Sequence, residues 1–255
     1  MLWQKSWLET RWRFLIGLAL LLCSAGAVVF AYPRVVQLLP LVPKLDVSGE
    51  IGRRIQEAAE LSSSYRGYIW SQWFRQNLAQ TWTLFAVLLG TGGLLSQTTS
   101  GGALFTLSLP VSRGRLVAVR AATGLVELLI LAIVPSLVIP VLSPGVGETY
   151  GVGSALVHGM CLFIGGTVFF SLAFLLSTIF TDVWRPLLIA LGVSFVLSFC
   201  EQAVRGLSRY GIFGVMSAES HFRGAGLPWV GLALAAAVSA LLIFAAMKNI
   251  ARQDF

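Results

Sequence analysis

The sequence carries very little charge. Only 11% of its 255 residues are Asp, Glu, Lys or Arg, whereas an average soluble domain has about 25%. With 56% hydrophobic residues, too little polar surface is left to cover a water-soluble globule, which excludes a soluble enzyme and a disordered chain. The net charge of +7 does not indicate a nucleic-acid partner, because basic loops of membrane proteins face the cytoplasm and anionic lipid headgroups. The composition predicts a multi-pass membrane protein in contact with lipid and with no nucleic acid.

The sequence also has few motifs or residues that could bind ATP or a metal ion or catalyse a reaction. The chain has no G-x-x-x-x-G-K-[ST] motif and no Gly-Lys dipeptide, so it has no P-loop for ATP. Of its two histidines, His158 lies one turn from Cys161, but two ligands do not make a zinc site, and His221 is expected to be solvated in an outer loop. The three cysteines lie inside apolar runs and are expected to be free packing residues: Cys23, Cys161 and Cys200. We therefore expect no enzyme activity, no catalytic residue, no bound metal and no cofactor held by this chain.

Six apolar runs are candidates for membrane-spanning helices. A bilayer core of about 30 Å requires about 20 apolar residues per helix. Suitable runs occupy residues 14–32, 81–96, 121–142, 155–180, 186–203 and 229–247. Pro33 is expected to end the first run, and Pro135 and Pro140 to kink the outer half of the third. The sequence thus predicts an all-α protein in which residues 1–255 form a single transmembrane domain with both termini on one side.

Basic residues favour a cytoplasmic location for both termini. With the termini inside, nine Lys and Arg residues fall on each side, but those inside are packed into shorter segments. The first apolar run continues through Val28, Val29 and Phe30, so we expect it to remain as a span rather than to be cleaved as a signal peptide. These patterns predict a multi-pass protein of the plasma (inner) membrane.

Two segments outside the spans have patterns of their own. Residues 1–13 place Lys5 and Glu9 on one helical face and Trp3 and Trp7 on the opposite face, which predicts an interfacial helix, although the start of the first span fits the same residues. Residues 33–80 form a long extracytoplasmic segment, too short for an independent domain. Its aromatic-rich part, residues 65–74, is expected to be either a helix lying on the membrane surface or a loop anchored by its aromatic rings.

Residues 98–120 predict a cytoplasmic helix–break–helix elbow. Pro110 halts a helix before it, and Ser112 can cap a new helix that starts at Arg113. Such an elbow exposes a small apolar surface, which we call the apolar knob, bordered by basic residues. This arrangement is typical of a docking site, although an elbow that only lies among the lipid headgroups fits the same pattern. The expected docking residues are Leu107, Leu109, Pro110, Val111, Ser112, Arg113 and Arg115.

Two carboxylates are predicted at membrane depth, where such groups are costly. Glu127 is expected either to make an interhelical hydrogen bond or ion pair, or to line a substrate path. Glu201 precedes Arg205 by four residues, which predicts a structural pair within one helix.

Several stretches together resemble the membrane subunits of ABC type-2 exporters. They are the Trp- and Arg-rich start, residues 3–14; the elbow sequence FTLSLPVSR, residues 105–113; residues 120–127; and DVWRP, residues 182–186. The run QTTSGG at 97–102 departs from the charged run that family members often carry before the elbow. The resemblance implies that the elbow is the coupling helix that docks on the ATPase.

The same resemblance implies a permease that works with other subunits. A second copy of the chain, or a related subunit, would pair with two separate P-loop ATPase subunits, which hold the ATP and Mg. ATP binding would then drive export of a substrate that the sequence does not identify. Two other functions remain open: an ATP-independent carrier or channel that uses Glu127, and a membrane anchor through which an ATPase acts mechanically on an outside partner, with residues 33–80 as the critical part.

Overall fold

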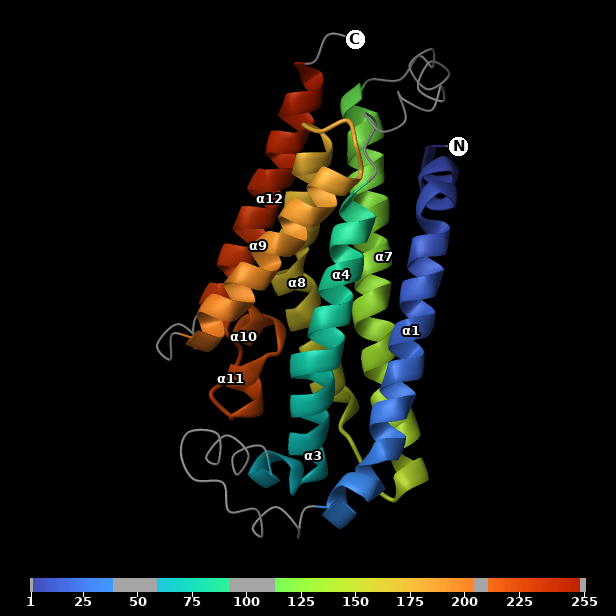
Figure 1. The fold of residues 1–255 in the computed structure, drawn as a ribbon, viewed down its shortest axis with the longest axis vertical. Coiled ribbons are helices and arrows are strands. Elements are labelled where there is room, and N and C mark those ends of the chain that lie inside the picture. Colours follow the sequence, from blue (N-terminus) through green and yellow to red (C-terminus); the bar gives the residue numbers. More distant parts are fainter. Residues whose placement is uncertain (1, 39–58, 92–112, 204–210, 253–255) are drawn as a thin grey trace.

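The protein is a bundle of long helices (Figure 1). The computed structural model describes residues 2–38, 59–91, 113–203 and 211–252, and every regular element in these ranges is helical. The long helices are α1 (Leu2–Leu38), α4 (Ala79–Gly90), α7 (Arg113–Leu142), α8 (Val152–Ser177), α9 (Trp184–Ala203) and α12 (Trp229–Ala251). The short ones are α3 (Tyr65–Tyr68), η2 (Ile69–Leu78), η3 (Ser143–Val146), α10 (Ile212–Met216) and α11 (Glu219–Phe222).

Five stretches of the described residues are long and apolar enough to cross a membrane: Leu2–Leu38, Gly114–Val146, Val152–Ser177, Trp184–Glu201 and Trp229–Ala251. Each contains most of one expected span, because unbroken apolar sequence of this length favours helix in a bilayer, where every backbone polar group must be bonded internally. Pro33 does not end the first helix, which continues to Leu38, and Pro135 and Pro140 both lie inside α7.

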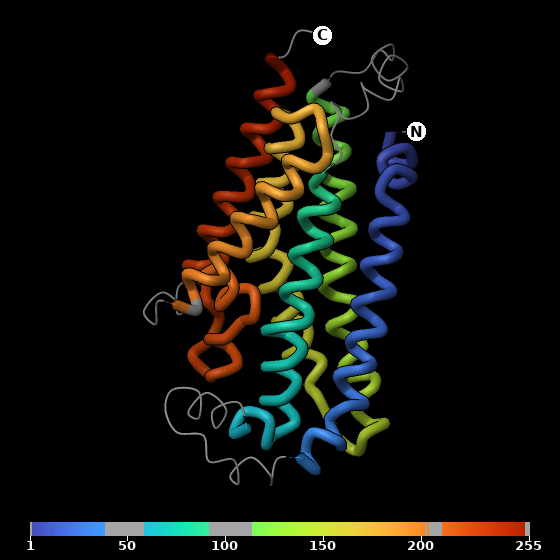
Figure 2. The backbone as a smooth tube through the Cα atoms, in the orientation of Figure 1, coloured from blue at the N-terminus to red at the C-terminus, as the bar shows by residue number. Residues whose placement is uncertain are grey.

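The long helices alternate in direction. In Figure 1, α1, α7 and α9 run one way, and α4, α8 and α12 run the other. The start of α1, the end of α4, the start of α7 and the end of α12 therefore lie at one end of the bundle, which we call the terminal end. The start of α8 and the short helices α3, α10 and α11 lie toward the other end, the distal end. Figure 2 shows α10 and α11 folded back beside the long helices rather than projecting from them.

The expected separate interfacial helix is instead the first part of α1. Residues 2–14 are helical, but they run without a break into the apolar part of the same helix. Two polar side chains explain this continuity. Ser6 and Thr10 lie on the same buried face of α1 as Phe14 and Gly17. This helix packs along α7. The start of α1 is therefore held by the bundle, while Trp3 and Trp12 remain exposed.

The aromatic-rich segment at 65–74 does not lie on the surface of the bundle. Here α3, η2 and α4 follow one another directly over residues 65–90, so the helix begins well before the expected start of the second span. Trp70 and Trp73 are completely buried, and the Tyr68 hydroxyl donates to the carbonyl of Val28 in α1. The segment carries several polar residues in η2, which is why hydropathy alone predicts a later start for this helical run.

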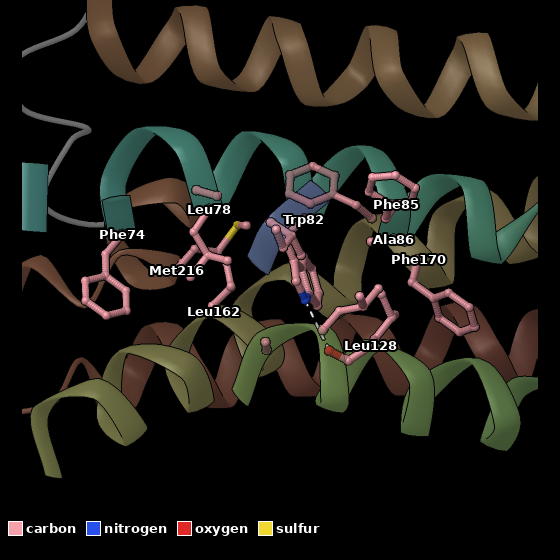
Figure 3. Packing of buried hydrophobic residues seen from close by; sticks show 14 of the residues in the cluster. Phe74, Leu78, Trp82, Phe85, Ala86, Leu128, Leu162, Phe170 and Met216 are labelled. Atoms are coloured by element: carbon pink, nitrogen blue, oxygen red, sulfur yellow. Dashed lines mark hydrogen bonds between the residues drawn. The ribbon is translucent and has the colours of Figure 1, made fainter. Parts of the chain in front are cut away.

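Trp82 of α4 lies at the centre of the core (Figure 3). Its indole N–H donates to the carbonyl of Leu128 in α7, at 3.1 Å. Its ring lies against Gly166 of α8, where an added Cβ would come within 2.2 Å of the Trp82 ring. One side chain thus joins three helices, and it can do so only because Gly166 has no side chain.

We expect Gly166→Ala to destabilise the bundle by about 1–3 kcal/mol, because the new methyl group must displace a completely buried indole. Thermal unfolding of the detergent-solubilised protein measures this effect. Gly153→Ala, in the first turn of the same helix, is the matched control, because nothing lies within 4 Å of its added Cβ. It should be neutral or slightly stabilising. Equal melting temperatures for the two variants would contradict this account of the core.

Candidate functional site

A buried polar network lies near the terminal end of the bundle. Glu127 of α7 is 1% exposed, and it accepts a hydrogen bond from the Thr10 hydroxyl of α1. Arg120, about two turns earlier in α7, pairs with Glu9 of α1, with 2.9 Å between Nη1 and Oε2. Glu127 thus makes the interhelical hydrogen bond that was one of its two expected roles. The network fixes the register of α1 on α7 where apolar contacts alone would allow sliding.

Arg13 joins the same end of α1 to α4. Its Nη1 donates to the carbonyl of Leu88, at 2.8 Å, and to the carbonyl of Thr91, at 3.2 Å. Leu88 is in the last turn of α4 and Thr91 is the residue directly after the helix. Carbonyls at a helix end lack partners within the helix, and the negative end of the helix dipole attracts a cation, so the guanidinium stabilises this end of α4. Arg13 therefore ties the start of α1 to the residues that directly precede the expected elbow.

Most of the expected elbow lies outside the described residues. This applies to Leu107, Leu109, Pro110, Val111 and Ser112. The described part of α7 begins at Arg113, and Arg115 in its first turn is exposed. Figure 1 places the end of α4 and the start of α7, which flank these residues in the sequence, at the terminal end.

A polar stripe follows the exposed side of η2 and α4. Arg75, Gln76, Asn77 and Gln80 are all exposed, although they lie in the middle of the helical run from 65 to 90. At about 1.5 Å per residue, Gln80 is about 15 Å along the helix from the end of α4 at Gly90. Were this run to cross a bilayer core of about 30 Å, polar side chains there would be costly against lipid, so the stripe would have to face water or another subunit.

Glu201 joins the end of α9 to α10. Its carboxylate accepts from the backbone N–H of Phe213, at 3.1 Å and 3.2 Å to its two oxygens. It therefore caps the start of α10 and holds this short helix against the end of α9. Arg205, the expected partner, lies outside the described residues.

The two histidines are neighbours near the distal end, which sequence reasoning missed. His158 of α8 and His221 of α11 have ring centroids 5.8 Å apart. His221 was expected to be solvated, but its Nε2 is buried. The two positions are far apart in the sequence, and α10, which packs on α8 and contacts α11, brings them together. Among the described residues no group of three or more His, Cys, Asp and Glu side chains could hold a metal ion.

The described helices define a helical, multi-pass membrane protein. Comparison with protein-family models, with curated proteins and with solved structures found no match.

We expect Arg13→Gln to loosen the end of α4. The shorter, uncharged amide loses hydrogen bonds from a cation to two carbonyls, which are worth about 1.5–3 kcal/mol in total. Thermal unfolding should show the loss, and hydrogen exchange should become faster in the last turn of α4. Arg11→Gln in the same helix is the control, since Arg11 is exposed and its described contact is with the neighbouring Trp12 ring. Unchanged exchange at 88–91 in Arg13→Gln would refute the capping role.

A cysteine at Gln80 is expected to react with a membrane-impermeant maleimide in intact membranes, because the polar stripe needs water or a hydrated interface. The background should have its three free cysteines replaced. Phe195→Cys is the control, since Phe195 is a 72% exposed apolar side chain in the middle of α9 and is expected to face lipid. Equal labelling of both positions, or protection of position 80 alone, would show that the stripe does not face water.

Proposed function

We propose that this protein is the transmembrane subunit of an ATP-driven exporter of the ABC type-2 kind. In this proposal two copies pair with two separate P-loop ATPase subunits, and the terminal end of the bundle faces the cytoplasm. The run 65–90 serves as a sixth span, and residues 98–120 form the coupling elbow. The sequence resemblance supports the family, and the alternating direction of the long helices in Figure 1 fits six passes with both termini on one side.

The observation that carries the transport proposal is the polar stripe on η2 and α4. A helix that only anchored the protein would gain by presenting apolar residues at this depth. Instead Arg75, Gln76, Asn77 and Gln80 are exposed at the centre of the run. Pairing of two copies across this face would enclose a polar path between them, so each side chain would avoid lipid and contact either water or the substrate.

The contacts of Arg13 support coupling between the elbow and the rest of the bundle. The start of α1 holds the last turn of α4 through Arg13 and holds α7 through Thr10 and Glu127. A displacement of the elbow by an ATPase would therefore be passed to α1, α4 and α7 together rather than absorbed at the end of one helix. In the absence of these links, the apolar surfaces of the helices would slide more easily.

The direct test is purification of the tagged chain from its native membrane in mild detergent, followed by mass spectrometry. We expect a P-loop ATPase in about equal amount, lost when Leu109→Asp places a charge in the apolar knob of the elbow. Trp184→Asp is the control, because Trp184 is a 70% exposed aromatic residue at the start of α9, on the terminal end but outside the elbow. An ATPase that still copurifies with Leu109→Asp, or is lost equally from both variants, would contradict docking through the elbow.

The same preparation separates the two alternatives. A chain that purifies alone, with transport abolished by Glu127→Gln and unaffected by Leu109→Asp, would establish the ATP-independent carrier. The buried hydrogen bond from Thr10 to Glu127 favours a structural role for this carboxylate instead. Copurification of the ATPase together with loss of function on trimming residues 33–80 would establish the mechanical anchor.

A further inference from the structure

Two arginines toward the distal end lie over one pair of stacked aromatic rings. Trp70 of η2 and Phe222 of α11 are stacked, with ring centroids 4.2 Å apart and an interplanar angle of 5°. The guanidinium carbon of Arg75 lies 5.5 Å from the Trp70 centroid, and that of Arg66 lies 5.7 Å from the Phe222 centroid. Residues of α3, η2 and α11 thus hold two cations beside the same two rings. Figure 1 shows α3 and α11 toward the same end of the bundle.

The two rings are a fixed support. Trp70 is completely buried, and its indole N–H donates to the carbonyl of Ser217, at 3.1 Å. Phe222 packs against the hydrophobic core. A cation over an aromatic ring is attracted by the negative charge of the ring face, and this contact uses none of its N–H donors. Each guanidinium is therefore held in place while its N–H groups remain available to another partner.

The winding of the helix places Arg75 over Trp70. Neighbours on one face of an α-helix are three or four residues apart, whereas these two residues are five apart. The i→i+5 hydrogen bonding of a π-helix brings such a pair together, and η2 is a π-helix over Ile69–Leu78. This winding is rare, is mostly limited to a single turn, and occurs frequently at functional sites. Its extent over ten residues here coincides with the residues that position Arg75.

The charges of the two arginines are not compensated. Arg66 and Arg75 are both exposed, and neither pairs with a carboxylate among the described residues. The only carboxylate of α11, Glu219, is 2.8 Å from the guanidinium of Arg223 and is paired with it. Two unpaired cations on one support give a local positive potential, which favours an anion at this position.

We propose that Arg66 and Arg75 bind a water-soluble anion that carries phosphate or carboxylate groups. The planar guanidinium presents N–H donors in a geometry that matches both of these groups. The polar stripe continues from Arg75 to the exposed amides of Gln76, Asn77 and Gln80. An amide can both donate and accept, so the stripe can bind hydroxyl or amide groups elsewhere on the same ligand.

The polar stripe also favours a water-soluble ligand over an anionic lipid. A lipid with its headgroup on Arg75 would lay its acyl chains along the surface beside it. The apolar side chains that flank this residue in the run, Phe74 and Leu78, are buried, so the chains would meet the amides instead. Apolar chains against amides leave the amides without hydrogen-bond partners, which is costly.

This assignment names a substrate class for the polar stripe, and in that respect it rests on the proposed function. Binding of the anion itself needs neither an ATPase nor a second copy of the chain. Arg75→Gln should therefore leave copurification of the ATPase unchanged. A chain that binds the anion but purifies without an ATPase would contradict the proposed function and leave the anion site standing.

The test is calorimetric titration of the full chain, in neutral detergent at low ionic strength, with inorganic pyrophosphate and with citrate as probes. Saturable binding is expected, and it should weaken as salt is added. Arg66→Gln and Arg75→Gln should each lower the affinity about tenfold, through loss of charge-assisted hydrogen bonds. Arg75→Lys should lose less than Arg75→Gln, because it keeps the charge without the planar donors. Both arginines are exposed, so the variants should keep the wild-type gel-filtration profile.

Arg11→Gln is the matched control. Arg11 is also exposed and also lies over a tryptophan ring, that of Trp12, at 5.5 Å, but it has no second arginine on the same rings. Its removal should leave the affinity for both probes unchanged. The proposal fails if the wild type binds neither probe saturably, or if Arg11→Gln lowers the affinity as much as Arg75→Gln does.

A second measurement separates the soluble anion from a lipid headgroup. The wild type and Arg75→Gln are reconstituted in nanodiscs of phosphatidylcholine and phosphatidylglycerol, and the lipid that each retains is measured by native mass spectrometry. Equal retention of phosphatidylglycerol is expected. Less phosphatidylglycerol on Arg75→Gln, with Arg11→Gln retaining the wild-type amount, would assign the arginines to a lipid headgroup and overturn the water-soluble ligand.

Discussion

The packing of Trp82 against Gly166 sets the spacing of the three central helices. In a membrane the hydrophobic effect does not drive helices together, because lipid tails are as apolar as the side chains, and close packing and hydrogen bonds take its place. The Trp82 indole provides close packing, because its ring lies against α8, and a hydrogen bond, because its N–H donates to the Leu128 carbonyl of α7. The helix that carries Trp82 is the one with the polar stripe, so this contact also orients the stripe away from the core.

Polar contacts connect the helices near both ends of the bundle. At the terminal end Thr10 donates to Glu127, and Arg13 donates to carbonyls at the end of α4, which connects α1, α4 and α7. Toward the distal end the carboxylate of Glu201 accepts from the backbone N–H of Phe213, and Nδ1 of His158 lies 3.0 Å from the carbonyl oxygen of Ser217. Because the surroundings have a low dielectric constant, these hydrogen bonds contribute more than they would in water.

Much of the fold could be predicted from the sequence, because a bilayer allows few structures. Long apolar runs in the chain coincide with α1, α7, α8, α9 and α12, and their bounds differ from expectation mainly where polar residues are involved. The pattern at the start of α1 predicted a surface helix because Lys5 and Trp7 lie on opposite faces of the helix. In the structure the buried face there carries Ser6 and Thr10. The run 65–90 starts earlier than expected because its polar residues lower the hydropathy without breaking the helix.

The sequence by itself determined that this is a helical protein with several helices long and apolar enough to cross a membrane. These properties depend on the local amino-acid composition and on the spacing of apolar residues along the chain. Only the tertiary structure decided which partners individual polar residues have: Thr10 for Glu127, the end of α4 for Arg13, Phe213 for Glu201, and His221 for His158. Each of these contacts joins residues distant in sequence or on separate helices. They depend on how the helices rotate and pack against one another, which no pattern within a single helix encodes.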